Sequence, residues 1–252
     1  MRANGNPVLL LHGQPGGAAD WDAVIADLGD GFAAIAADRP GWDGHSRAQD
    51  LAGNGIAALA TLEAHDAQRA TVVGHSLGAA IAAWLGVHYP ERVSALVLCA
   101  PAANTAALYP AERWLAAPVA AELTSATTMG GLGMALSVPG LAPRLAKRVG
   151  IDPGYVSTAR RKLLEPAAWR AYAAEQRYLI RDLPALEARL GAIAAPTTIL
   201  TGTGDRVVPP KAPRRLAEQI PDAHLVACPG AGHLLPQRHP QMVADAIRHV
   251  LS

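Results

Sequence analysis

The stretch Gly74-His75-Ser76-Leu77-Gly78 lies between a short apolar run, Ala70–Val73, and an alanine-rich segment, Ala79–Tyr89. The run predicts a buried strand and the segment predicts a helix. A turn this short between a strand and a helix is so tight that the residues two before and two after the serine must lack bulk. The pattern Gly-x-Ser-x-Gly in this context predicts a nucleophile elbow, with Ser76 forced outward at the positive end of the helix. The alternative is a serine that only caps the helix.

Composition excludes several classes of protein. The 252 residues include 22 Lys+Arg and 21 Asp+Glu. Half of all residues are hydrophobic, and 17% are charged. This content of apolar residues excludes disorder, and a net charge of +1 gives no general attraction to nucleic acid or to anionic membranes. The apolar runs are interrupted before the ~20 residues that a membrane span needs. We therefore expect a globular cytoplasmic protein without nucleic-acid or membrane partners.

Strand-like runs alternate with helical patterns along most of the chain. The runs are nearly continuous in apolar character, as strands covered on both faces must be. This alternation predicts a doubly wound, mostly parallel α/β sheet. The expected strands are Pro7–Leu11, Phe32–Ala37, Ala70–Val73, Val93–Cys99, Thr197–Thr201 and His224–Ala227, and the expected helices are Trp21–Leu28, Ile56–His65, Ala79–Tyr89, Pro213–Gln219 and Pro240–Leu251.

A long segment between the fourth and fifth expected strands breaks this alternation. Residues 104–181 show helical patterns and prolines but no convincing strand. We predict that they form a helical cap, or lid, over the carboxyl edge of the sheet, where ligands bind in such folds. Residues 1–103 and 182–252 would then form the core. The stretch Gly130-Gly131-Leu132-Gly133 lacks the Gly-Lys-Ser/Thr of a phosphate loop, so we interpret it as a flexible joint of the lid.

Two further side chains complete a candidate catalytic triad. A serine needs a base, and the base needs an acid to orient it. Asp205 follows the fifth expected strand, and His233 lies in a loop after the sixth. Both therefore fall at the edge of the sheet that holds Ser76, in the chain order Ser…Asp…His. Asp205 could instead pair with Arg206, and His233 could be an ordinary turn residue.

Acyl transfer also needs hydrogen-bond donors for an oxyanion. The elbow supplies the backbone N–H of Leu77. The second donor should come from the loop after the first strand, His12-Gly13-Gln14-Pro15-Gly16, and Pro15 has no N–H. We therefore assign the backbone N–H of Gln14, although the segment could also be a plain turn.

The sequence predicts neither a metal nor a cofactor. No His, Asp or Glu cluster has metal-ligand spacing. Cys99 and Cys228 fall in non-adjacent expected strands, so we expect two buried thiols.

Taken together, these motifs resemble the α/β-hydrolase superfamily, in its serine-nucleophile branch with a helical cap. The matching pieces span residues 7 to 251 and are His12-Gly13-Gln14-Pro15-Gly16, Asp38-Arg39-Pro40-Gly41, Gly74-His75-Ser76-Leu77-Gly78, Gly204-Asp205 and Gly232-His233. The resemblance implies a core sheet, a lid over Ser76, and hydrolysis of an ester-like bond through an acyl-enzyme. A serine instead of an aspartate at position 76 argues against the dehalogenase and epoxide-hydrolase branches.

The chain departs from this family pattern in two places. The loop Gly41-Trp42-Asp43-Gly44-His45-Ser46 has one residue more than the usual Gly-x-Gly-x-Ser. Only six residues precede Pro7, too few for the antiparallel hairpin with which family members usually begin. The strand Phe32–Ala37 would then form an exposed edge of the sheet, and such an edge invites pairing. We therefore hypothesise a homodimer, formed edge to edge or through the lid.

We expect a carboxylesterase-like activity on a small-molecule ester. The predicted lid is rich in Ala, Leu and Met and contains Trp114 and Trp169, which favours short or medium apolar acyl groups. The alternatives on the same triad are prolyl aminopeptidase, lactonase, carbon–carbon bond hydrolase and perhydrolase activity. The first would need lid carboxylates to hold a substrate ammonium, with Glu122, Glu165 and Glu175 as candidates. A ligand-binding receptor built on a hydrolase scaffold is the alternative from another class.

Overall fold

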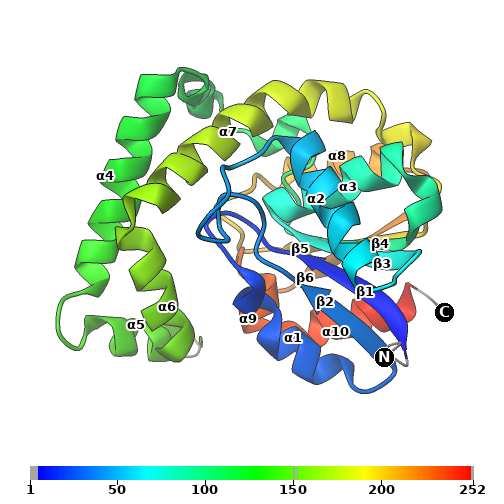
Figure 1. Cartoon of the computed structure of the whole chain (residues 1–252), viewed down its shortest axis with the longest axis horizontal. Coiled ribbons are helices and arrows are strands. Elements are labelled where there is room, and N and C mark those ends of the chain that lie inside the picture. The colour runs from blue at the N-terminus through cyan, green and yellow to red at the C-terminus, as the bar shows by residue number, and fades with distance from the viewer. Residues whose placement is uncertain (1–4, 150, 152, 251–252) are drawn as a thin grey trace.

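A six-stranded parallel sheet forms the centre of the computed structural model, which describes residues 5–149, 151 and 153–250 (Figure 1). The strands are β1 (Asn6–Leu11), β2 (Phe32–Ala36), β3 (Ala70–His75), β4 (Val93–Cys99), β5 (Thr197–Gly202) and β6 (Ala223–Cys228). Their order is β2-β1-β3-β4-β5-β6, and every neighbouring pair is parallel. The predicted α/β class is confirmed, and each predicted strand is present within about one or two residues of its expected bounds.

Helices cover both faces of this sheet. They are η1 (Ala18–Trp21), α1 (Asp22–Leu28), α2 (Leu51–Ala64), α3 (Leu77–His88), η2 (Pro90–Arg92), η5 (Leu190–Ala192), α8 (Lys211–Gln219), α9 (Leu235–Arg238) and α10 (Pro240–His249). In Figure 1, α2 and α3 lie above the strands, while α1 and α10 lie below them. Successive strand residues point to opposite faces. Leu9 accordingly packs in the cluster with α2 and α3, and Leu10 packs in the cluster with α1 and α10.

Helix α2 begins at Leu51, earlier than the expected start at Ile56. The Asp50 side chain caps it by accepting a hydrogen bond of 2.9 Å from the backbone N–H of Gly53. Gly53 and Gly55 resemble helix breakers in the sequence. Gly55 is nevertheless needed for packing, because a Cβ built there would lie 2.4 Å from ring carbons of Trp84.

The chain between β4 and β5 forms a helical insertion, a name that we use for residues 105–187. It contains η3 (Thr105–Ala107), η4 (Pro110–Ala116), α4 (Pro118–Leu136), α5 (Leu141–Val149), α6 (Pro153–Leu164) and α7 (Pro166–Glu187). Figure 1 shows α4, α5 and α6 projecting to one side of the sheet, with α7 leading back toward it. Helix α7 continues past residue 181, where the sequence analysis placed the boundary.

The glycines at positions 130 to 133 do not form a flexible joint. They lie inside α4, so that prediction is wrong. A Cβ at Gly130 would lie 3.0 Å from Cζ2 of Trp169, and one at Gly133 would lie 2.9 Å from Cδ2 of Leu164. These two glycines therefore let α4 approach α6 and α7 closely.

Strand β2 forms one edge of the sheet and pairs with β1. Within the described residues no strand covers this edge, so the hypothesis of an edge-to-edge dimer stays a prediction. Both cysteines are buried and free, as expected. A membrane-crossing helix would have to be longer and more apolar than any helix among the described residues.

Helix α4 contains a glycine that packs against a neighbouring helix, Gly133, and one with open space around it, Gly131, so the two can be compared by substitution. Gly133→Val should lower the free energy of unfolding by about 1–3 kcal/mol, because the added methyl groups have no room beside Leu164. Gly131→Val is the matched control, since nothing lies within 4 Å of a Cβ built at Gly131. Denaturant unfolding of the two variants measures the difference, and equal destabilisation would contradict this role for Gly133.

Candidate active site

Ser76 occupies the turn between β3 and α3, where the backbone is strained. Its φ is 55° and its ψ is −116°, a combination that costs a non-glycine residue about 1–3 kcal/mol. A Cβ at Gly74 would lie 2.3 Å from the carbonyl oxygen of Gly78, and one at Gly78 would lie 2.1 Å from that of Leu11. Any side chain at either position would displace the backbone, so the predicted requirement for two small residues is confirmed.

Backbone hydrogen bonds hold this conformation in place. The N–H of Ser76 donates to the carbonyl of Cys99 at 2.9 Å, and its carbonyl accepts from the N–H groups of Ala79 and Ala102 at 3.0 and 3.2 Å. Leu77 is the first residue of α3, so its N–H has no acceptor within the helix. No other described residue accepts a hydrogen bond from this N–H, which can therefore donate to a substrate beside the serine.

Asp205 and His233 form a hydrogen-bonded pair, although they lie 28 residues apart in the chain. His233 Nδ1 lies 2.9 Å from Asp205 Oδ2. The other carboxylate oxygen, Oδ1, accepts hydrogen bonds from the N–H groups of Val207 and Val208 at 2.8 and 3.0 Å. Asp205 follows β5 and His233 follows β6, so both stand at the carboxyl edge of the sheet.

The pKa of Asp205 lies below its ordinary value. Burial raises this pKa, but the hydrogen bond and charge of His233, together with the two backbone N–H groups, outweigh burial. The carboxylate therefore stays ionised at neutral pH, where it can hold the imidazole in one orientation.

His75 joins this pair to the elbow. Its Nε2 lies 2.9 Å from the carbonyl oxygen of His233, and the two imidazole rings are 4.9 Å apart. Burial and the neighbouring His233 lower the pKa of His75 to about 3, so it is neutral. Ser76 and His233 share no hydrogen bond in the described part of the chain. The structure thus pairs Asp205 with His233 and places His233 beside the elbow, but the hydrogen bond between His233 and Ser76 is not formed there.

The loop after β1 lies over the elbow, as predicted. A Cβ built at Gly13 would lie 3.1 Å from Cβ of Ser76 and 3.1 Å from Nδ1 of His75. Gln14 follows, and its side-chain Nε2 donates to Oε1 of Gln176 in α7 at 2.6 Å. Among the described residues, none accepts a hydrogen bond from the backbone N–H of Gln14, which leaves this group free for the predicted role.

A buried ion pair that sequence reasoning missed lies behind this loop. The guanidinium of Arg39 pairs with the carboxylate of Glu175, and both side chains are almost wholly inaccessible to solvent. Trp42 Nε1 donates to Glu175 Oε2 at 2.9 Å. The carboxylate of Glu175 is therefore already paired with Arg39 and Trp42, while Glu122 and Glu165 are exposed. The expectation that Glu175 could hold a substrate ammonium loses its support.

Asp20 is a buried carboxylate beneath the same loop. Its Oδ2 accepts from the N–H of Gly17 at 3.3 Å, and the hydroxyl of Tyr155 in α6 forms a side-chain hydrogen bond with it. Burial raises the pKa of Asp20 to about 6. A Cβ at Gly16 would lie 2.6 Å from this oxygen, so the loop rests directly on the carboxylate.

Asp20 should make stability depend on pH. Because its folded pKa is raised, the proton binds the folded state more tightly, and this stabilisation is lost as pH rises from about 4 through about 6. The free energy of unfolding of Asp20→Asn minus that of the wild type should therefore increase between pH 4 and pH 7. Asp22→Asn, at an exposed position nearby, is the control. Denaturant unfolding at several pH values in this range measures these free energies. The assignment would be contradicted if the difference between Asp20→Asn and the wild type, like that between Asp22→Asn and the wild type, did not change with pH.

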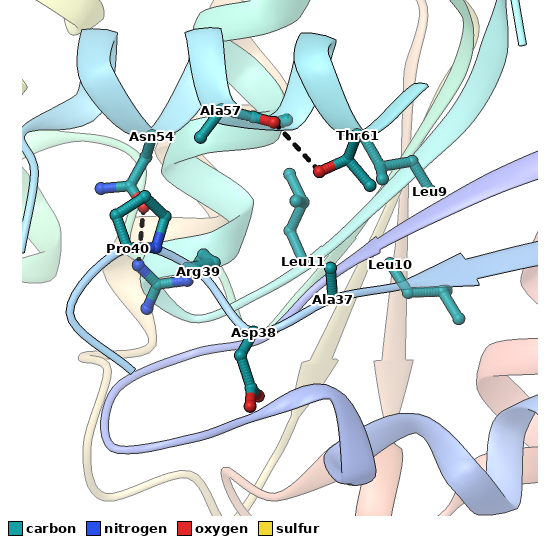
Figure 2. A pocket seen from close by; sticks show the side chains of 11 residues that line it. Leu9, Leu10, Leu11, Ala37, Asp38, Arg39, Pro40, Asn54, Ala57 and Thr61 are labelled. Carbon is teal, nitrogen blue, oxygen red and sulfur yellow. Dashed lines mark hydrogen bonds between the residues drawn. The ribbon is translucent and has the colours of Figure 1, made fainter. Parts of the chain in front are cut away.

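The described cavities lie away from the triad. One of about 30 Å³ lies between β1, α2 and Arg39, where Figure 2 shows the guanidinium pointing toward Asn54. It is large enough for a water molecule but not for a substrate. A larger hollow of about 810 Å³ lies between α7 and α8, and none of its lining residues belongs to the triad.

Comparison with known proteins places this geometry in a family. The family model described as the alpha/beta hydrolase fold matches residues 6–240. A protein of Variovorax paradoxus, RutD, which is named provisionally as a carbamate hydrolase, is 30% identical over 92% of this chain and 86% of its own. The 2-hydroxymuconate semialdehyde hydrolase of Pseudomonas sp. is 27% identical over 98% of this chain and 87% of its own.

A solved structure agrees with these sequence matches. The thermophilic esterase of Thermogutta terrifontis superposes with a TM-score of 0.76 and 26% identity, covering 99% of this chain and 90% of that one. The family match covers most of the chain and includes the elbow, the acid and the loop over the serine. The chain belongs to the alpha/beta hydrolase fold family, and it is a hydrolase.

Proposed function

We propose that this hydrolase cleaves carboxylic esters through a triad of Ser76, His233 and Asp205. The observation that carries the proposal is the hydrogen-bonded pair of Asp205 and His233, held against a strained elbow by the contact of His75 with the His233 carbonyl. A strained serine beside an oriented histidine is the arrangement that nucleophilic acyl transfer requires.

The proposed reaction has two halves. His233 Nε2 takes the proton of Ser76 as Oγ attacks the acyl carbon, and the backbone N–H groups of Gln14 and Leu77 bind the resulting oxyanion. Asp205 holds the imidazole through Nδ1 and stabilises its cation. The imidazolium then gives its proton to the departing alcohol. Water, deprotonated by the same histidine, cleaves the acyl-enzyme and releases the carboxylic acid.

The first step requires a rearrangement of the site. The Ser76 hydroxyl must rotate or the His233 ring must shift to form their hydrogen bond. Such bonds are often long in a site without substrate and shorten when it binds. The helical insertion would act as the lid whose closure accompanies this change.

Relatives with different substrates define the alternatives. The Thermogutta protein is named an esterase, whereas the Pseudomonas relative is named for a semialdehyde substrate and RutD for a carbamate. An ester is favoured by α4 of the insertion, which carries a single charged residue, Glu122, and exposes Leu123 and Met134, so that it offers few charges to recognise a polar acyl group. Lactone, carbon–carbon bond and peracid chemistry would use the same triad. A ligand-binding receptor built on this scaffold would retain the fold and the triad residues, with little or no turnover.

Active-site substitution tests the triad. Ser76→Ala should abolish both the burst of acylation with a p-nitrophenyl ester and labelling by a fluorophosphonate. Asp205→Asn should lower kcat by roughly 10³–10⁴-fold, because the histidine loses the acceptor that fixes its tautomer. Ser94→Ala, which removes a hydroxyl on β4 that is bonded to Thr71, should leave kcat within about twofold. Normal turnover by Ser76→Ala would refute the triad, and labelling without turnover in the wild type would favour a receptor.

A substrate panel tests the bond that is cleaved. We expect kcat/KM to be highest for p-nitrophenyl esters with short or medium acyl chains. The comparison set contains a proline amide, an aryl carbamate, a lactone and, as a substrate with a carbon–carbon bond to cleave, 2-hydroxy-6-oxo-6-phenylhexa-2,4-dienoate. Higher kcat/KM for any of these than for every ester, with Ser76 still required, would retain the triad but replace the proposed substrate class.

A further inference from the structure

The peptide unit between Gly13 and Gln14 carries the proposed oxyanion donor on one side and an anchored carbonyl on the other. The carbonyl oxygen of Gly13 accepts a hydrogen bond of 2.9 Å from Arg39 Nη2 and one of 2.8 Å from His12 Nδ1. A trans peptide is planar, with its C=O and N–H pointing in opposite directions. Whatever fixes the direction of the Gly13 oxygen therefore also fixes the direction of the Gln14 N–H.

The tautomer of His12 is set by its surroundings. Its Nε2 accepts from the backbone N–H of Arg39 at 3.0 Å, so the ring proton must sit on Nδ1, which faces the Gly13 oxygen. Burial, and then the charge of Arg39, lowers the pKa of His12 well below its ordinary value. His12 is thus a neutral donor that supports the same carbonyl.

Arg39 is held on every side by acceptors. Its Nε donates to the carbonyl of His12 at 3.0 Å, and Nη1 donates to Oδ1 of Asn54 at 3.0 Å, the contact drawn in Figure 2. The remaining donors face Gly13 and the two carboxylate oxygens of Glu175. All five N–H groups of the guanidinium are therefore used, in the fixed fork geometry that only arginine provides.

Glu175 supplies the negative charge that lets Arg39 stay buried. A buried cation without a partner costs several kcal/mol, so the position of the guanidinium depends on this carboxylate. Glu175 belongs to α7 in the helical insertion and lies 136 residues away along the chain. Its neighbour Gln176 bonds to the side chain of Gln14 at 2.6 Å. Two successive residues of α7 therefore contact the structure that carries the oxyanion donor.

We propose that Arg39 and Glu175 are positioning residues that aim the backbone N–H of Gln14 at the oxyanion. The inference rests on the proposed function of Ser76 and names how the helical insertion takes part in it. Through Glu175 and Arg39, the position of α7 sets the direction of the Gly13–Gln14 peptide. The cation at the Gly13 oxygen also polarises this peptide and strengthens its N–H as a donor.

Steady-state kinetics of two single variants test this proposal. Arg39→Lys keeps the charge but loses the fork, and Glu175→Gln keeps the shape but loses the charge. We expect each to lower kcat for a p-nitrophenyl ester by about 10- to 100-fold, with KM changed by less than about threefold, because an oxyanion donor acts mainly in the transition state. The affinity for a trifluoromethyl ketone, which forms a tetrahedral adduct, should fall in the same proportion as kcat/KM.

A second carboxylate on α7 provides the matched control. Glu187 pairs with Arg215 at 2.7 Å and accepts hydrogen bonds from Thr105 and Gln219, away from the loop after β1. Glu187→Gln should leave kcat and the affinity for the ketone within about threefold of the wild type. It tests whether any loss follows from weakening α7 in general.

A double variant keeps the test decisive if a single variant fails to fold. Arg39→Met with Glu175→Met removes both buried charges and preserves much of their volume, so it should fold. It should still lose about 10-fold or more in kcat per active site titrated with fluorophosphonate. Folded variants of Arg39 and Glu175 that have the wild-type kcat, or that change KM alone, would overturn the positioning role. In that case an inactive Ser76→Ala variant would still support the triad. Normal ester turnover by Ser76→Ala would remove both proposals.

Discussion

The close approach of the end of β1 to the elbow is the constraint on which the site depends. The carbonyl of Leu11 lies where a side chain at position 78 would otherwise be, so the strand and the turn pack backbone against backbone. The strained turn at Ser76 and Gly13 lie so close together at this edge that Gly13 has little room for a side chain beside the serine. Parallel pairing of β1 with β3 is what aligns the two loops at one edge.

A second layer of interactions ties the helical insertion to this edge. Trp42 is buried both in the apolar cluster of the insertion and against Glu175, so the long loop after β2 connects the two parts of the chain. Lys162 of α6 donates to the carbonyl of Gly16 at 3.0 Å. Gln176 of α7 accepts a hydrogen bond from Gln14 in the same loop, so two different helices of the insertion contact the loop that carries Gln14. The insertion is therefore built into the support of the site.

The sequence was sufficient to predict the sheet and the elbow because each rests on local chemistry. Continuous apolar runs indicate buried parallel strands, and two glycines that flank a serine indicate a turn with no space for side chains at their positions. Gly130 and Gly133 were misinterpreted, because a glycine that admits a neighbouring helix looks the same in sequence as one that bends the chain. Gly53 and Gly55 hid the first turn of α2 for a similar reason.

The partnership of Arg39 with Glu175 could not be found in this way. Arg39 was visible within the stretch Asp38-Arg39-Pro40-Gly41, but its partner is one of several glutamates in a segment whose helices are placed by tertiary packing. Asp205 and His233 were predictable because each follows a strand, and the topology carries both to the same edge. Whether His233 forms a hydrogen bond with Ser76 depends on side-chain rotamers, which the sequence does not determine.

The most direct test of this account is the crystal structure of the enzyme with a phosphonate bonded to Ser76 Oγ. We predict that the phosphoryl oxygen lies about 3 Å from the backbone nitrogens of both Gln14 and Leu77, with His233 Nε2 within hydrogen-bond distance of Oγ. A phosphoryl oxygen directed away from Gln14 while Arg39 still holds the Gly13 carbonyl would contradict it.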